Sequence, residues 1–162
     1  MLAYMQHVGY SPGMNVTDAY PLVVVADTEE VRDWYVRHLG FSVGFELDWV
    51  VLLTSPGKRP FGVCFMREGL DHQLPQFRTR IIGDALVLTL EVEDVEEALH
   101  EIEATGIGPE VSLRDEPWGQ RHFMLRDPAG IWLDVVQPIE PDPDFVGEAA
   151  VDQLATLNNA ND

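Results

Sequence analysis

Hydrophobic and polar positions along the chain follow one pattern twice. A β-rich run over 20–26 ends at Asp27, and a second such run over 87–93 ends at Asp94, 67 residues further on. Short runs of Val, Leu and Thr are typical of strands. After each aspartate, apolar positions recur every three or four residues, which indicates a helix that buries one face. The pattern therefore predicts a strand followed by a helix in each half of the chain.

The residues at the ends of the predicted helices support this interpretation. An aspartate with a glutamate three residues later is typical of a capping box at a helix start, and a glycine suits the left-handed position after a helix end. These residues are Asp27, Glu30 and Gly40 in the first copy and Asp94, Glu97 and Gly106 in the second. We expect an apolar residue, Phe41 or Ile107, to start the next strand in each copy.

The rest of each copy adds two further strands. The run 49–56 leads into a Pro-Gly turn and then the apolar run 61–65, while 121–127 leads into Asp-Pro-Ala-Gly and then 131–136. Each half therefore reads strand, helix, strand, strand, strand. We predict an α+β fold of two βαβββ modules that form a half-open curved sheet. The expected segments are an irregular extension 1–18, module one 19–66, a polar connector 67–84, module two 85–139, and an acidic tail 140–162 with a short helix.

Composition narrows the classes of function. The formal net charge of the 162-residue chain is −18, from 28 acidic and 10 basic residues, which argues against binding nucleic acid or anionic lipid. The sequence shows neither an apolar run of membrane-spanning length nor a signal-peptide pattern. Cys64 is the only cysteine, so an intrachain disulfide is excluded. We expect an acidic, cytoplasmic globular protein.

Two segments carry a resemblance to a known family. The capped helix 27–41 and the hairpin segment 117–136, with its Asp-Pro-Ala-Gly turn, resemble the vicinal oxygen chelate (VOC) superfamily. That superfamily includes glyoxalase I, bleomycin-resistance proteins, fosfomycin-resistance enzymes and extradiol dioxygenases. The resemblance covers about residues 19–139. It implies that the sheets form a cup, usually completed by a second chain in a homodimer.

The resemblance also implies where a metal would be held. The positions that match the metal ligands of the family are Tyr20, Cys64, Val87 and Asp134. Valine has no donor atom and a neutral tyrosine is a poor ligand, so we predict no metal and no cofactor.

These observations favour a metal-independent binding protein of the bleomycin-resistance type, which sequesters a cationic or aromatic small molecule without turnover. The acidity fits a cationic ligand. The alternatives are a metal-dependent VOC enzyme, glyoxalase-like or dioxygenase-like, with an altered metal site, and a scaffold or regulatory dimer without a ligand.

Eight residues are candidates for contacting the ligand. They are Trp118, His122, Met124, Trp132 and Asp134 in module two and Tyr20, Trp49 and Phe65 in module one. Asp134 alternates with apolar residues on one strand, so it needs a partner, either a ligand cation or a base such as Arg121. Trp118 is expected to cover a flat ligand or to pack over the sheet edge. His122 is expected as a polar wall residue. Tyr20, Trp49 and Phe65 line the cup or belong to the core.

Overall fold

Each half of the chain folds into a four-stranded sheet with a helix against it, as the repeat predicts. The computed structural model describes residues 18–82, 84 and 86–147. Module one contains β1 (Leu22–Val25), α1 (Thr28–Leu39), β2 (Ser42–Leu47), β3 (Val50–Thr54) and β4 (Gly62–Arg67). Module two contains β5 (Val87–Glu91), α2 (Val95–Ala104), β6 (Val111–Glu116), β7 (Gln120–Arg126) and β8 (Trp132–Pro138). A 3₁₀ turn (Pro75–Phe77) lies in the connector, and α3 (Pro143–Val146) follows β8.

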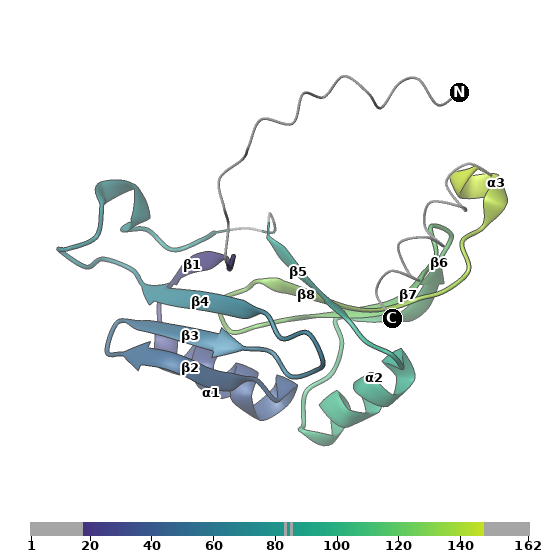
Figure 1. Ribbon diagram of the computed structural model, residues 1–162, viewed down its shortest axis with the longest axis horizontal. Helices are drawn as coiled ribbons and strands as arrows, with labels where there is room; N and C mark the ends of the chain where they lie inside the picture. The colour runs from purple at the N-terminus through teal and green to yellow at the C-terminus, as the bar shows by residue number, and fades with distance from the viewer. Residues whose placement is uncertain (1–17, 83, 85, 148–162) are drawn as a thin grey trace.

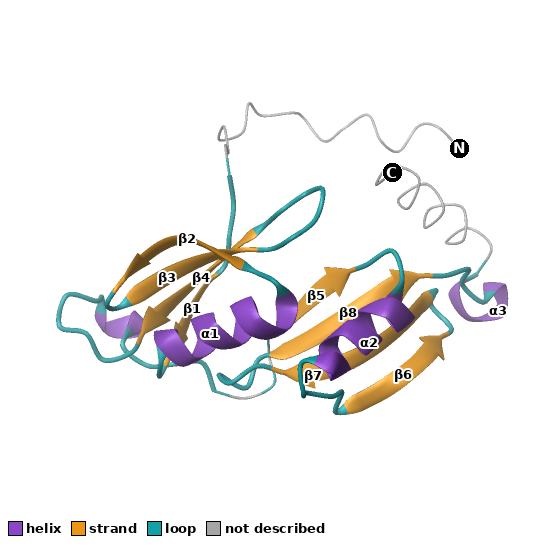
Figure 2. Ribbon diagram, turned by 90° about the horizontal axis from the view of Figure 1, so that it is seen from below, coloured by secondary structure: helices purple, strands orange, loops and turns teal. Residues whose placement is uncertain are grey.

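The two sheets have the same topology. Their strand orders are β1-β4-β3-β2 and β5-β8-β7-β6. β1 pairs with β4 and β5 with β8 in parallel, and the remaining neighbours are antiparallel. Both helices lie on the same side of the sheets (Figures 1 and 2), so each sheet has one face that is turned away from α1 and α2. We call these the outer faces of module one and module two.

The predicted aspartate caps and the glycines after the helices are confirmed. The Asp27 carboxylate accepts hydrogen bonds from the backbone N–H groups of the second and third helical residues, at 2.9 and 3.0 Å, and Asp94 does the same at 3.0 Å for both. Gly40 follows α1 with φ +67°, and Gly106 has φ +91° just after α2. These left-handed conformations favour glycine because it has no Cβ.

The predicted start of a strand at Ile107 is wrong. Pro109 follows closely and has no backbone N–H for a sheet ladder. β6 begins only at Val111, and Ile107 instead packs against the core.

One hydrophobic core extends through both modules between the sheets and the helices. Its fully buried side chains include Tyr35, Phe65, Phe123 and Leu133. Of the two alternatives for Phe65, the structure shows the core, because its ring packs under α1 with its centroid 5.2 Å from that of Tyr35. A polar contact also joins the modules. The Tyr35 hydroxyl donates to Oδ2 of Asp127, in the β7–β8 turn, at 3.1 Å.

Other expectations concern the ends of the chain. The N-terminal extension up to residue 17 and the predicted helical positions beyond 147 lie outside the described residues. The expected module and connector boundaries stay predictions. None of the helices in the described part of the chain is long and apolar enough to cross a membrane.

Candidate functional site

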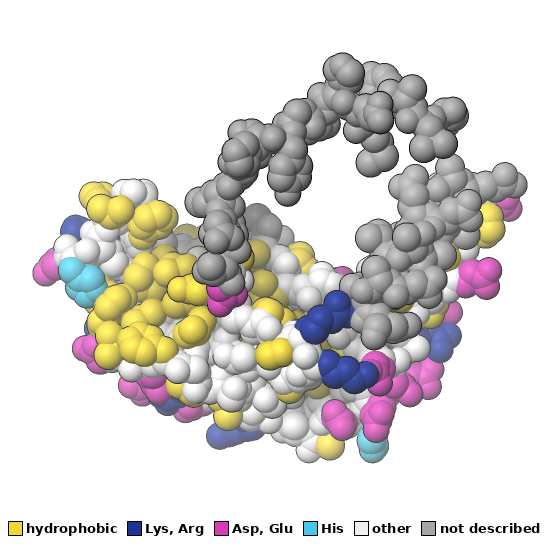
Figure 3. Space-filling model, viewed as in Figure 1, with side chains coloured by type: hydrophobic (Ala, Val, Ile, Leu, Met, Phe, Trp, Pro, Cys, Tyr) yellow, Lys and Arg dark blue, Asp and Glu magenta, His cyan; other side chains and the backbone are white. Residues whose placement is uncertain are grey.

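The outer faces of the two modules differ in chemistry. The outer face of module one is apolar in every strand: it comprises Leu22, Val24, Phe45, Leu47, Val50, Leu52, Cys64 and Met66. Phe45, Leu47 and Leu22 are exposed, and Figure 3 shows hydrophobic side chains gathered over this sheet. Trp49 packs on the same face, and Tyr20 lies beside it near Gly62. The structure therefore places Tyr20 and Trp49, two of the three candidates of module one, on an exposed apolar surface.

The outer face of module two carries charged and polar side chains. Phe123, Leu125, Leu133 and Val135 point into the core, so the alternate residues of β7 and β8 point outward. In the antiparallel register His122 lies opposite Val136, and Met124 lies opposite Asp134. β6, the edge strand, adds Arg114 opposite His122. This face therefore brings a histidine, a carboxylate and a guanidinium close together.

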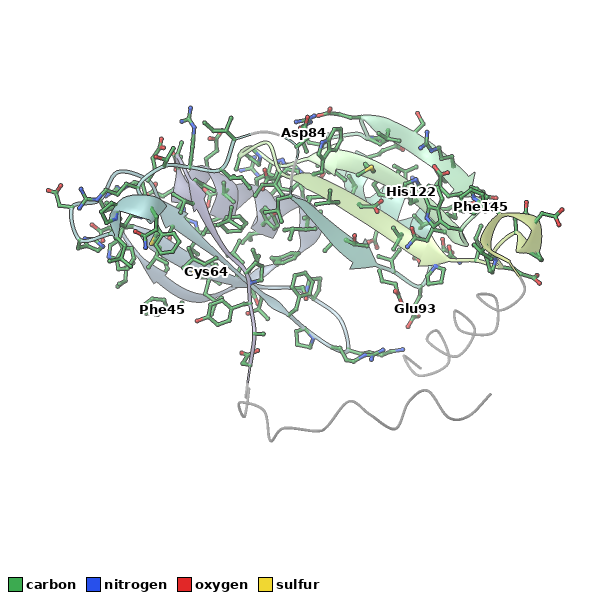
Figure 4. All side chains as sticks on the ribbon, turned by 90° about the horizontal axis from the view of Figure 1, so that it is seen from above. Phe45, Cys64, Asp84, Glu93, His122 and Phe145 are labelled. Carbon is green, nitrogen blue, oxygen red and sulfur yellow. The ribbon has the colours of Figure 1, made fainter. Side chains whose placement is uncertain are left out.

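His122, which is labelled in Figure 4, lies between two carboxylates. Its Nδ1 lies 2.7 Å from Oδ1 of Asp134, and its Nε2 lies 3.3 Å from Oε1 of Glu116. His122 is only 5% exposed. The Asp134 and Glu116 side chains are 15% and 11% exposed. An ionised carboxylate can only accept, so a ring with a hydrogen on each nitrogen would donate to both. The arrangement is a largely buried polar network on an open sheet face.

Arg114 is the outermost member of this network. Its Nε lies 2.5 Å from Oε1 of Glu116, two residues along the same strand. The Arg114 side chain is 60% exposed. Glu116 therefore joins a buried histidine to a guanidinium in contact with solvent.

Trp118 lies beside the network, in the turn between β6 and β7. Its indole N–H donates to Oε1 of Gln120 at 2.7 Å, and its ring centroid is 6.4 Å from that of His122 and 6.3 Å from that of Phe145. Trp118 is 40% exposed, and Phe145 is exposed on α3. The two rings together form an aromatic edge next to His122.

Gly119 allows this arrangement of the turn. It has φ +97°, and a Cβ there would lie 3.0 Å from the Ile139 carbonyl oxygen and from Cβ of Pro141. The Ile139 N–H donates to the Gly119 carbonyl at 2.9 Å. This hydrogen bond and the close approach of the chain at Gly119 hold the residues that follow β8 against the turn that carries Trp118.

Trp132 has a partner of its own on the same outer face. The guanidinium carbon of Arg126 lies 3.9 Å from the Trp132 ring centroid. Asp84 accepts from the Trp132 indole N–H at 3.2 Å and pairs with Arg126 at 2.7 Å. One face of this ring is therefore already covered by a cation from the protein itself.

The residues at the family's metal positions do not fit a metal. Cys64 is buried among apolar side chains, and this burial raises the pKa of its thiol, which disfavours the thiolate that binds metals. Val87 offers no donor. The two carboxylates of the network lie at opposite nitrogens of His122, so one ion cannot meet all three groups. Across the described residues no group of three His, Cys, Asp or Glu side chains could hold a metal ion.

A hollow of about 380 Å³ lies where the two modules meet, away from this network. It is lined by Val24, Val25, Ala26, Arg80, Ile81, Pro128, Ala129 and Gly130. Its one charged lining side chain, Arg80, pairs with Glu68 at 3.2 Å. Because these walls carry little that could orient a ligand, the outer face of module two is the better candidate site.

The structure brings four sequence-predicted residues onto this outer face near one another, namely Trp118, His122, Met124 and Asp134. Arg121 is not the partner of Asp134: it bonds Asp115, at 2.5 Å, and Glu96 of α2. The prediction missed Glu116 and Phe145. Glu116 lies two residues before Trp118 in a strand-like run, and this spacing could have indicated it, whereas nothing in the acidic tail singled out Phe145.

Comparison with known proteins agrees with this architecture. A bleomycin-binding protein complexed with bleomycin is 23% identical, with a TM-score of 0.56, and the match covers 75% of this chain and 98% of that one. The antibiotic binding protein TnmS3 from Streptomyces sp. CB03234 is 23% identical, with a TM-score of 0.59 and coverages of 78% and 99%. Lactoylglutathione lyase from Agrobacterium tumefaciens is 19% identical, with a TM-score of 0.59 and coverages of 76% and 96%. Such identities show the shared fold alone.

Among curated proteins no sequence matches the chain. The family comparison is more direct, because the sequence profile of one superfamily matches residues 14–135, which is most of the chain. Together with the paired βαβββ topology, this match shows that the chain belongs to the Glyoxalase/Bleomycin resistance protein/Dioxygenase superfamily.

Proposed function

We propose that this protein binds a small molecule on the outer face of module two and does so without a metal and without turnover. The observation that carries the proposal is the His122 network beside the exposed ring of Trp118. A buried polar group is stable only when it is hydrogen-bonded, as His122 is. This hydrogen-bonded group lies next to the exposed ring of Trp118. The combination offers a ligand both polar partners and a flat apolar contact.

The charge of the molecule favours a cationic ligand. The formal net charge is −18, so cations concentrate near its surface. Trp118 offers its ring to a cation as well as to an aromatic body. Two structural neighbours of the same fold bind bleomycin and an antibiotic, according to their names. These neighbours support a binding protein, while the poor fit of the metal positions argues against an enzyme like the neighbouring lactoylglutathione lyase.

The binding proposal is tested by thermal denaturation with a panel of cationic glycopeptides, aromatic antibiotics and dicarbonyl or aldehyde metabolites. A ligand at 100 times its Kd should add about 2.7 kcal/mol to the free energy of unfolding. We expect at least one cationic aromatic compound to raise the melting temperature. The bound compound should be recovered unchanged, as mass spectrometry can establish.

A chelator provides the control for metal independence. Treatment with EDTA should leave both the melting temperature and the ligand-induced shift as they were, because Val87 and Cys64 offer no usable ligands. The contradicting result is a melting temperature that EDTA lowers and that zinc, nickel, manganese or iron restores. That result would favour a metal-dependent enzyme over a metal-independent binding protein.

We further propose that a second copy of the chain covers the outer face of module one in a homodimer. Phe45, Leu47 and Leu22 are exposed there together with Tyr20, and contiguous apolar patches on proteins commonly mark interfaces. Sedimentation velocity at micromolar concentration should give about twice the chain mass of 18.2 kDa. A Phe45→Glu variant should shift the population toward monomer, whereas a monomeric mass for the unmodified protein would contradict the dimer.

A further inference from the structure

We propose that Glu116, and not Asp134, contacts the positive charge of the ligand. This inference rests on the proposed function and specifies the ligand class, an aromatic cation. Both carboxylates lie on the outer face of module two and both contact His122. They differ in how firmly each is already paired, and that difference decides which of them can exchange its partner for a ligand.

Asp134 is committed to His122. Its Oδ1 lies 2.7 Å from Nδ1 of a histidine that is almost fully buried. Drawing Asp134 toward a ligand would leave a buried imidazole nitrogen without its partner, and breaking a buried pair is costly. We therefore assign the Asp134–His122 contact to stabilising the outer face of module two and not to binding the ligand.

Glu116 has an exchangeable partner. It contacts His122 at the longer distance of 3.3 Å, and its closer partner is Arg114 at 2.5 Å. The Arg114 side chain is 60% exposed on the edge strand, so its guanidinium can be hydrated by water when it leaves Glu116. A ligand cation can replace the Arg114 guanidinium, which then returns to solvent. Glu116 keeps a cationic partner throughout, so the exchange leaves no carboxylate unpaired.

The neighbouring aromatic edge indicates what carries the cation. Trp118 is two residues after Glu116, is partly exposed, and lies near His122 and Phe145. A flat ring stacked on Trp118 gains aromatic contact while its cationic group lies on the side of Glu116. This geometry favours a cationic group attached to a flat aromatic body over an aliphatic amine.

The experiment uses two probes of nearly the same shape. N-methylacridinium carries a permanent positive charge, and acridine is neutral at mildly alkaline pH. Binding of each to the full chain is measured by calorimetry and by quenching of tryptophan fluorescence. We expect Glu116→Gln to weaken N-methylacridinium by at least about tenfold and to leave acridine within about twofold. Asp115→Asn is the matched control, because it makes the same change in charge at the adjacent residue, whose carboxylate pairs with Arg121 and not with the network.

Arg114→Gln is a second variant with the opposite expected effect. Removing the competing guanidinium should tighten N-methylacridinium by about twofold to fivefold without changing acridine. Thermal denaturation of each variant shows whether it is folded, and the Arg114 result tests the proposal even if Glu116→Gln unfolds.

Three outcomes would overturn the inference. A charge-selective loss in Asp134→Asn with no loss in Glu116→Gln assigns the contact to Asp134. Equal losses of both probes in Glu116→Gln show a structural role for Glu116. If the unmodified protein does not prefer N-methylacridinium over acridine, the ligand is not a cation and this inference is wrong. If the protein binds acridine but not N-methylacridinium, the inference is wrong but the proposed small-molecule binding still stands.

Discussion

Replacing His122 with alanine is expected to lower the free energy of unfolding by about 3 kcal/mol. The imidazole is almost fully buried and contacts both Asp134, at 2.7 Å, and Glu116, at 3.3 Å. Without the imidazole, the mostly buried Asp134 carboxylate loses its partner at 2.7 Å, while Glu116 keeps Arg114. Urea unfolding followed by circular dichroism measures the loss.

A double-mutant cycle shows whether the loss comes from the network. Adding Asp134→Asn to His122→Ala should recover about 1–2 kcal/mol, because the second substitution removes an unpaired buried charge. His100→Ala, at an exposed position of α2, serves as a control and should cost almost nothing. Strictly additive effects of His122→Ala and Asp134→Asn would mean that the two side chains do not stabilise each other.

Tyr35→Phe is expected to lower the free energy of unfolding by about 2 kcal/mol at neutral pH. Tyr35 is fully buried in α1, and its hydroxyl donates to Oδ2 of Asp127 at 3.1 Å. Oδ1 of Asp127 accepts from the Ile131 N–H at 2.8 Å, so the carboxylate joins α1 of module one to the β7–β8 turn of module two. The variant removes one donor from a buried carboxylate. Tyr20→Phe, at an exposed tyrosine, is the control and should leave stability nearly unchanged.

The effect of Tyr35→Phe should depend on pH. Burial raises the pKa of the Asp127 carboxyl above its ordinary value. A group with a raised pKa in the folded state contributes stability below its unfolded pKa, about 3.9 for aspartate, and loses that contribution as pH rises through the folded value. The Tyr35 hydroxyl stabilises the ionised form, so its removal raises the pKa of Asp127 further. The difference in unfolding free energy between the unmodified protein and Tyr35→Phe should therefore widen from acidic to neutral pH.

The Asp127→Asn background isolates this dependence. An amide does not ionise, so the cost of Tyr35→Phe in that background should be the same across the pH range. Urea unfolding at a series of pH values provides the comparison. A pH-dependent difference that persists in Asp127→Asn would show that another group is responsible.

The paired modules and their caps could be predicted because they depend on short-range patterns. The aspartate caps at 27 and 94 act on backbone groups two and three residues away, and alternation along a strand needs only the strand itself. The same alternation places Asp134 on the same face of β8 as Trp132 and Val136, whereas the register of β7 against β8 brings His122 and Met124 beside it. The start of β6 was missed because it depends on Pro109 as well as on the apolar pattern.

Phe65 shows where alternation stops being informative. β4 is covered on both sides, with Phe65 in the main core and Cys64 and Met66 under Trp49 on the outer face. A strand that is apolar on both faces has no polar positions to tell one face from the other. Its neighbours in three dimensions decide which side chain lies under the helix.

The sequence by itself determined the two βαβββ modules, the aspartate caps and the apolar character of the core, because each follows from local periodicity or from the internal repeat, and the superfamily was indicated by the resemblance of two segments. Only the tertiary structure decided which charges meet. The bulge in β6 between Val111 and Arg114 sets which of its residues face outward, and the register of β7 against β8 places His122 near Asp134. Ion pairs and hydrogen bonds act over a few ångströms, so the partners of Glu116 and Asp134 depend on how separate strands are aligned across the sheet, which local sequence patterns do not specify.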